Sequence, residues 1–191
     1  MLRALVVIDY QNDFLSEGAL AVPSGNEVGP VIHSMASDFD LILASLDWHP
    51  FNHVSFETFR PADERECEIS AAIEKWPVHC VGFTGGAMPG VDLDVRGVQR
   101  FFPKACDRLT EELSCVAKGA ESECARFLRS AQVDEVHLVG LALDYCVKDS
   151  ALGLVEVGFS THVHLRGTRS LSPNPENSIE HMVSAGVRIH E

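Results

Sequence analysis

A cysteine stands where an apolar segment gives way to helix-like sequence. The stretch "LVGLALDYCVKD" covers residues 138–149 and places Cys146 shortly after Gly140 and Ala142. The free N–H groups and partial positive charge at a helix N-terminus favour a thiolate. Cys146 is therefore a candidate nucleophile, although a small buried apolar residue is the more usual role of a free cysteine. A nucleophilic cysteine needs a His, Asp or Lys partner from elsewhere in the chain.

A second group of residues has the types and spacing of metal ligands. The stretch "LDWHPFNHVSF" contains Asp47, His49 and His53, and "WPVHC" contributes His79. In extended chain, side chains two residues apart point to the same side, so Asp47 and His49 converge. Imidazoles together with a carboxylate suit Zn²⁺, Fe²⁺ or Mn²⁺, with water or substrate at the open positions. Ordinary polar side chains on a surface loop remain the alternative.

Asp9, Phe14 and Lys118 are further candidates. Asp9 directly follows the apolar run "LVVI", where a poorly solvated carboxylate needs a partner or a role, unless it caps a helix or turn. Lys118 follows the apolar run "LSCVA", and an ammonium group near a thiol favours the thiolate. A surface lysine is the alternative for Lys118. Phe14 could lay its ring over a pocket or simply pack in the core.

Apolar runs alternate with helical spacing and must position these groups. Strands are predicted at 2–8, 41–46, 113–117, 136–142, 161–165 and 186–190. Helices are predicted at 28–37, 121–131, 145–157 and 176–184. This alternation predicts an α/β fold with a mainly parallel sheet covered by helices on both faces. Ligands bind beyond the carboxyl ends of such strands, where the candidate residues stand.

The bulk composition restricts the class of protein. The chain has 191 residues, 46% of them apolar, which suits one domain over residues 1–191. Within it, residues 47–107 form a long segment that we interpret as a loop-rich metal- and substrate-binding insertion. The net charge of −13 argues against a nucleic-acid partner. The apolar runs are too short to span a membrane, and six cysteines without a secretion signal favour reduced thiols and the cytoplasm.

Six other histidines are spread over the expected strands and helices, and we interpret them as structural or solvent-exposed. They are His33, His137, His162, His164, His181 and His190.

The order of these motifs resembles the nicotinamidase/pyrazinamidase family of isochorismatase-like hydrolases. The resemblance rests on "VVIDYQNDF", "DWHP", "WPVHC", the Lys118–Gly119 pair and "GLALDYCV", and it extends from the first of these to about residue 173. It implies a three-layer α/β/α, doubly wound, Rossmann-like fold. Members usually carry a threonine or a similar polar residue at the position of Leu143, and residues 82–90 also depart from the family pattern.

The resemblance also implies roles for particular residues. The catalytic triad is implied at Asp9, Lys118 and Cys146, and the metal ligands at Asp47, His49 and His79, with His53 less secure. The nicotinamide ring is implied to lie among Phe14, Leu20, Trp76 and Tyr145. A cis peptide bond is implied between Leu141 and Ala142, and the N–H groups of Ala142 and Cys146 are implied to form the oxyanion hole.

The expected activity is hydrolysis of nicotinamide to nicotinate and ammonia, as in NAD salvage, with pyrazinamide as a second substrate. The expected cofactor is one divalent metal ion, zinc first and iron or manganese as alternatives. A small-molecule substrate is the expected partner, and association into a homo-oligomer stays open. Two alternatives remain: a related hydrolase acting on another amide or on a vinyl ether, and a non-catalytic pyridine-binding protein on the same fold.

Overall fold

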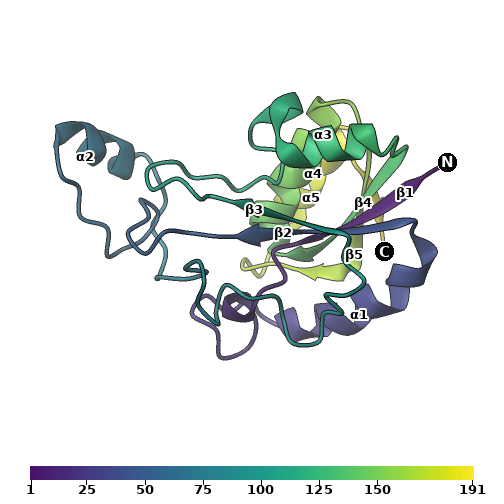
Figure 1. Ribbon diagram of the computed structural model, residues 1–191, viewed down its shortest axis with the longest axis horizontal. Helices are drawn as coiled ribbons and strands as arrows, with labels where there is room; N and C mark the ends of the chain where they lie inside the picture. The colour runs from purple at the N-terminus through teal and green to yellow at the C-terminus, as the bar shows by residue number, and fades with distance from the viewer.

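The computed structural model describes residues 1–191 and contains one parallel sheet of six strands in the order β3-β2-β1-β4-β5-β6 (Figure 1). The strands are β1 (Arg3–Ile8), β2 (Leu41–Asp47), β3 (Arg100–Lys104), β4 (Glu135–Leu141), β5 (Ser160–Arg169) and β6 (Arg188–His190). The chain runs outward from β1 to β3, then returns to place β4 beside β1. The strand order therefore reverses between β1 and β4, the position at which ligands bind in doubly wound folds.

Helices cover both faces of the sheet, as the sequence predicted. They are α1 (Val28–Met35), α2 (Glu64–Ala71), α3 (Glu123–Ser130), α4 (Lys148–Glu156) and α5 (Glu176–Ser184). In Figure 1, α3, α4 and α5 lie on one face of the sheet and α1 on the other, whereas α2 lies at the far end of the long segment after β2. The fold is a three-layer α/β/α structure.

The side chains of β1 point alternately to the two faces of the sheet, and each face has its own apolar core. Ala4, Val6 and Ile8 belong to the apolar cluster under α3, α4 and α5, whereas Leu5 and Val7 belong to the cluster under α1. All five are fully buried, as expected of a parallel strand covered on both sides. The apolar sequence of β1 thus reflects a central position in the sheet.

Two expected elements differ from the structure. Residues 113–117 form a turn rather than a strand, and the strand at this edge of the sheet is β3. The expected helix at 145–157 is divided into a short π-helical segment, Leu143–Val147, and α4. The other expected strands and helices are present with small shifts at their ends. No helix has the length and apolar character needed to cross a bilayer.

Candidate active site

Four polar side chains meet at the carboxyl ends of neighbouring strands. Asp9 follows β1, Asp47 ends β2, Lys104 ends β3, and Cys146 lies in the π-helical segment that follows β4. At most 5% of the surface of each residue is exposed. The parallel sheet therefore gathers two carboxylates, an ammonium group and a thiol into one buried cluster. One carboxylate oxygen from each of Asp9 and Asp47 and the Cys146 sulfur all lie within 4.8 Å of one another.

Lys104 joins the members of this cluster. Its Nζ lies 2.9 Å from Asp9 Oδ2 and 3.5 Å from Cys146 Sγ, and it also donates to Asp47 Oδ1. Asp9 Oδ1 accepts a further hydrogen bond of 2.7 Å from Ser45 Oγ. The ammonium group is thus fixed between two carboxylates and next to the sulfur.

The prediction that Lys118 joins Asp9 and Cys146 is wrong. The Lys118 side chain is 74% exposed, and its Nζ lies 3.5 Å from Glu112 Oε1 at the surface. The sequence placed Lys118 at the end of a strand, but the residues before it form a turn. Lys104, at the end of the true edge strand, takes the expected position.

Burial and the mutual charges set the protonation of the cluster. Desolvation raises the pKa of Asp9 and raises the pKa of the Cys146 thiol well above its usual value, although Lys104 opposes both shifts. Desolvation acts against the charged form of Lys104 too, but Asp47 and Asp9 more than offset it and raise the Lys104 pKa. The lysine is therefore charged, and the thiol keeps its proton until a base removes it.

Asp47, His49 and His79 form a second buried group beside this cluster. Asp47 Oδ2 lies 3.3 Å from His49 Nε2 and 3.7 Å from His79 Nε2. His79 Nδ1 lies 2.8 Å from the Pro77 carbonyl, to which it donates, so that Nε2 is free to face Asp47. A carbonyl acceptor on the other ring nitrogen is the usual support of a metal-binding histidine.

The burial and the unpaired nitrogens of His49 indicate whether this group fits a metal ion. The residue is 1% exposed, and neither of its ring nitrogens has a hydrogen-bond partner. Because unpaired buried polar atoms are costly, the vacant nitrogen facing Asp47 and His79 fits a ligand for a cation. Two imidazoles and one carboxylate with room for further ligands suit a divalent transition metal.

His53 does not join the metal-binding group. Its Nδ1 lies 2.7 Å from Ser55 Oγ and its Nε2 lies 3.1 Å from the Thr110 carbonyl, so both nitrogens are engaged elsewhere. Its ring packs on that of His49 with the centroids 4.3 Å apart. The suggestion of a fourth ligand is therefore wrong for this geometry, and His53 instead supports the His49 ring.

A pocket opens above both groups. The expected ring-contacting residues Phe14, Leu20, Trp76 and Tyr145 all line it, together with Asp47, His79, Ala142 and Cys146. Trp76 and Tyr145 meet edge to face with centroids 5.1 Å apart. The peptide bond between Leu141 and Ala142 is cis, as the resemblance implied. The pocket thus combines aromatic walls with the thiol and the metal-binding group.

Besides Lys104, the site contains further residues that the sequence did not indicate, among them Gln11 and Glu111. Gln11 is fully buried and binds the backbone of Asp47 twice at 2.8 Å, donating from Nε2 to its carbonyl and accepting at Oε1 from its N–H. Glu111 lines the pocket, and burial raises its pKa. The "DYQNDF" motif offered a signal for Gln11, but nothing in the sequence distinguished Glu111 from its acidic neighbours.

Comparisons with known proteins find relatives that match nearly the whole chain. The nicotinamidase of Saccharomyces cerevisiae is 34% identical over 202 residues, covering 92% of this chain and 91% of the relative. A pyrazinamidase of Pyrococcus horikoshii in complex with zinc aligns with a TM-score of 0.82 and 33% identity, covering 100% of this chain and 99% of the other.

A further structure, that of a yeast nicotinamidase bound to the inhibitor nicotinaldehyde, aligns with a TM-score of 0.83 and 28% identity over the full length of both chains. No family model matches the chain. The similarity to the curated relative extends over most of both sequences. The chain belongs to the nicotinamidase/pyrazinamidase family.

Proposed function

We propose that the chain hydrolyses nicotinamide to nicotinate and ammonia, with Cys146 as the nucleophile. The observation that carries the proposal is the position of the Cys146 thiol. It lies 3.5 Å from Lys104 Nζ, in the wall of a pocket that Asp47 and His79 also line. Relatives of similar length are named nicotinamidases, and one binds the inhibitor nicotinaldehyde. Hydrolysis of a vinyl ether without a metal ion would not require Asp47, His49 and His79 as a group.

The proposed reaction begins with transfer of the Cys146 proton to Asp9. The sulfur forms a bond to the amide carbon, and the carbonyl electron pair becomes an oxyanion, which the N–H groups of Ala142 and Cys146 stabilise. When the oxyanion collapses, the C–N bond breaks and the nitrogen leaves as ammonia with the proton held by Asp9. A water then attacks the thioester while Asp9 removes its proton, and the thiol is restored as nicotinate leaves.

Lys104 and the aromatic walls complete this assignment. The Lys104 ammonium lies close enough to Asp9 and Cys146 to stabilise negative charge on either group as the proton moves. Phe14, Leu20, Trp76 and Tyr145 are assigned to contact the substrate ring. Holding the ring in one orientation keeps the amide carbon near the sulfur and makes the attack effectively unimolecular.

Asp47, His49 and His79 are assigned to hold one divalent metal ion, for which zinc is our choice. A member of the family with 33% identity contains zinc, and the unpaired His49 nitrogens fit such an ion. When bound, the ion offers a coordination position for the pyridine nitrogen. Pyrazinamide has a ring nitrogen at the same position relative to its amide group, so it is proposed as a second substrate.

The direct test is the release of ammonia from nicotinamide and from pyrazinamide by the purified protein. The protein is assayed as prepared, after chelation and dialysis, and after zinc, iron or manganese is added back. Release that is lost on chelation and returns with metal supports both parts of the proposal. No release from either amide at full metal content would overturn the substrate assignment.

Replacing His49 by alanine is expected to lower ammonia release at least about 100-fold and to reduce the metal content by one ion per chain, because one of three protein ligands is lost. Metal content is measured by atomic emission after dialysis. The matched control is His33→Ala, since His33 is an exposed histidine on α1 outside the site. Full metal content and full activity in His49→Ala would contradict the assignment of this ligand.

A further inference from the structure

Four histidines from three strands gather far from the active site. In the sheet, His137 of β4 pairs with His162 of β5, and His164 of β5 pairs with His190 of β6. Because His162 and His164 are two residues apart, their side chains project from the same face. From the sequence these histidines were expected to be structural or solvent-exposed, and the register of the parallel strands brings them together.

This histidine cluster lies on the face covered by α1, near the beginnings of β4 and β5. His137 pairs with Leu5 of β1, which belongs to the apolar cluster under α1, and the His137 ring packs on Phe39 at 4.9 Å. The active site lies at the opposite ends of the strands. His137 and Ala142, which lines the catalytic pocket, are five positions apart along the chain, roughly 16 Å of extended backbone.

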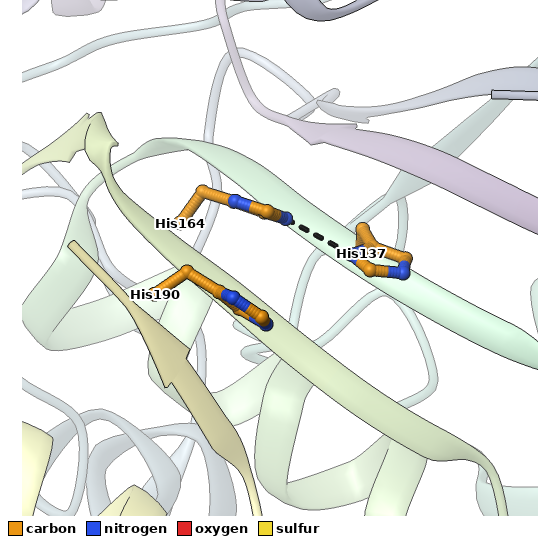
Figure 2. A group of neighbouring side chains, drawn as sticks. All are labelled: His137, His164 and His190. Atoms are coloured by element: carbon orange, nitrogen blue, oxygen red, sulfur yellow. Dashed lines mark hydrogen bonds between the residues drawn. The ribbon is translucent and has the colours of Figure 1, made fainter. Parts of the chain in front are cut away.

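The imidazoles approach one another closely. His137 Nδ1 lies 2.9 Å from His164 Nε2, and the rings of His164 and His190 stack with centroids 4.6 Å apart. Figure 2 shows the three rings side by side on one face of the sheet, with the contact between His137 and His164 as a dashed line. One ligand nitrogen from each of the three lies within 4.8 Å of the others.

Burial of the cluster is uneven. His137 is 6% exposed and turns its Nδ1 toward His164, whereas its Nε2 faces Glu135 Oε2 at 3.5 Å, on the side away from His164. His164 and His190 are only half-buried, so the cluster can be reached from solvent. A site with a buried inner ligand and an accessible outer side has the entry path that an ion requires.

The ring nitrogens of the four histidines face one another in two pairs. His137 Nδ1 faces His164 Nε2, and His162 Nδ1 lies 2.9 Å from His190 Nε2. Arg188 Nη1 lies 3.3 Å from His162 Nε2 and makes that side of the cluster unfavourable for a cation. The side formed by His137, His164 and His190 is therefore the better position for a cation.

We propose that His137, His164 and His190 bind a second divalent transition-metal ion, Zn²⁺, independent of the catalytic site. Two nitrogens on one tetrahedral Zn²⁺ are separated by about 3.3 Å, given Zn–N bonds of 2.0–2.1 Å. Binding the ion therefore requires that the 2.9 Å contact between His137 Nδ1 and His164 Nε2 and the 2.9 Å contact between His190 Nε2 and His162 Nδ1 both open. A set of imidazoles selects Zn²⁺, Cu²⁺ or Ni²⁺ and discriminates against Mg²⁺ and Ca²⁺, which prefer oxygen ligands.

The test is the number of Zn²⁺ ions per chain, measured by equilibrium dialysis of the full-length, metal-stripped protein against buffered Zn²⁺. Wild type is expected to bind two ions, and the double variant His164→Gln/His190→Gln one. That variant is expected to release ammonia at the wild-type rate, since neither residue contacts the catalytic pocket. His49→Ala is expected to bind one ion and to lose activity. The matched control His33→Gln/His181→Gln removes two exposed histidines and is expected to keep two ions.

Each outcome separates this proposal from the catalytic one. A single ion in wild type, lost in His49→Ala, would overturn the second site, and so would a second ion that survives in His164→Gln/His190→Gln. If the double variant does not fold by circular dichroism, His190→Gln alone replaces it, because His190 lies on the short edge strand β6. That variant is expected to raise the dissociation constant of the second ion at least tenfold, and an unchanged constant would overturn the proposal. The expected number of Zn²⁺ ions per chain does not depend on whether nicotinamide is the substrate.

Discussion

Replacing Cys146 by alanine is expected to lower the release of ammonia from nicotinamide by a factor on the order of 10⁴ or more, because no other group in the pocket can form the covalent intermediate. Cys146 is the only cysteine among the residues that line the pocket. The loss is expected in kcat, since the thiol is not needed to hold the ring. Ammonia release under saturating substrate measures it, and equilibrium dialysis shows whether the metal content is unchanged.

A buried cysteine outside the pocket provides the control for Cys146→Ala. Cys124 lies on α3, is 1% exposed, and belongs to the apolar cluster under α3, α4 and α5. Cys124→Ala removes the same thiol from a comparable environment and is expected to leave kcat within about twofold while lowering the free energy of unfolding by roughly 1 kcal/mol. Wild-type turnover in Cys146→Ala, with nicotinate as product, would mean that the chemistry does not pass through a thioester.

The central strands and most of the site could be predicted because their signals are local. The apolar sequence of β1 and β4 marks strands that are buried on both faces. Asp9 directly follows β1, and Cys146 lies in the short segment after β4. The spacing of Asp47 and His49 similarly predicted two convergent side chains. Parallel pairing alone was then sufficient to bring these groups to the same edge of the sheet.

The edge strand β3 could not be predicted for a physical reason. Its sequence "RFFPK" is short and contains Pro103, which has no N–H for the ladder and ordinarily argues against a strand. An edge strand tolerates proline because one side of it has no neighbour, and β3 is the first strand of the sheet. The more apolar run at 113–117 took its place in the prediction, and Lys118 was assigned the position that Lys104 occupies.

The histidine cluster could not be predicted from the sequence for a different reason. Which residues of β4, β5 and β6 face one another depends on the register of strands that are separated by whole helices. Sequence spacing carries no information on that register, since His137 and His190 are 53 positions apart along the chain. The cluster became visible only when the strands were paired in space.

Lys104→Met is expected to lower kcat for nicotinamide by a factor on the order of 10²–10³, because it removes the ammonium group that stabilises negative charge on Asp9 and Cys146. The substitution also leaves two buried carboxylates, Asp9 and Asp47, without their cation. Removing one partner of a buried ion pair typically destabilises a protein by about 3–5 kcal/mol. Urea unfolding of the metal-stripped protein measures this loss, and ammonia release measures kcat.

Lys118→Met is the matched control, because it makes the same chemical change at the lysine that the sequence alone indicated. Its exposed side chain contributes only a surface ion pair with Glu112, so kcat and the free energy of unfolding are both expected to stay close to wild type. Lys104→Gln, which keeps a polar group of similar length, separates charge from packing: a loss of kcat as large as in Lys104→Met assigns the effect to the missing charge. If instead Lys118→Met lost activity and Lys104→Met kept it, the position of the catalytic lysine at the end of β3 would be refuted, and with it the link between the edge strand and the chemistry.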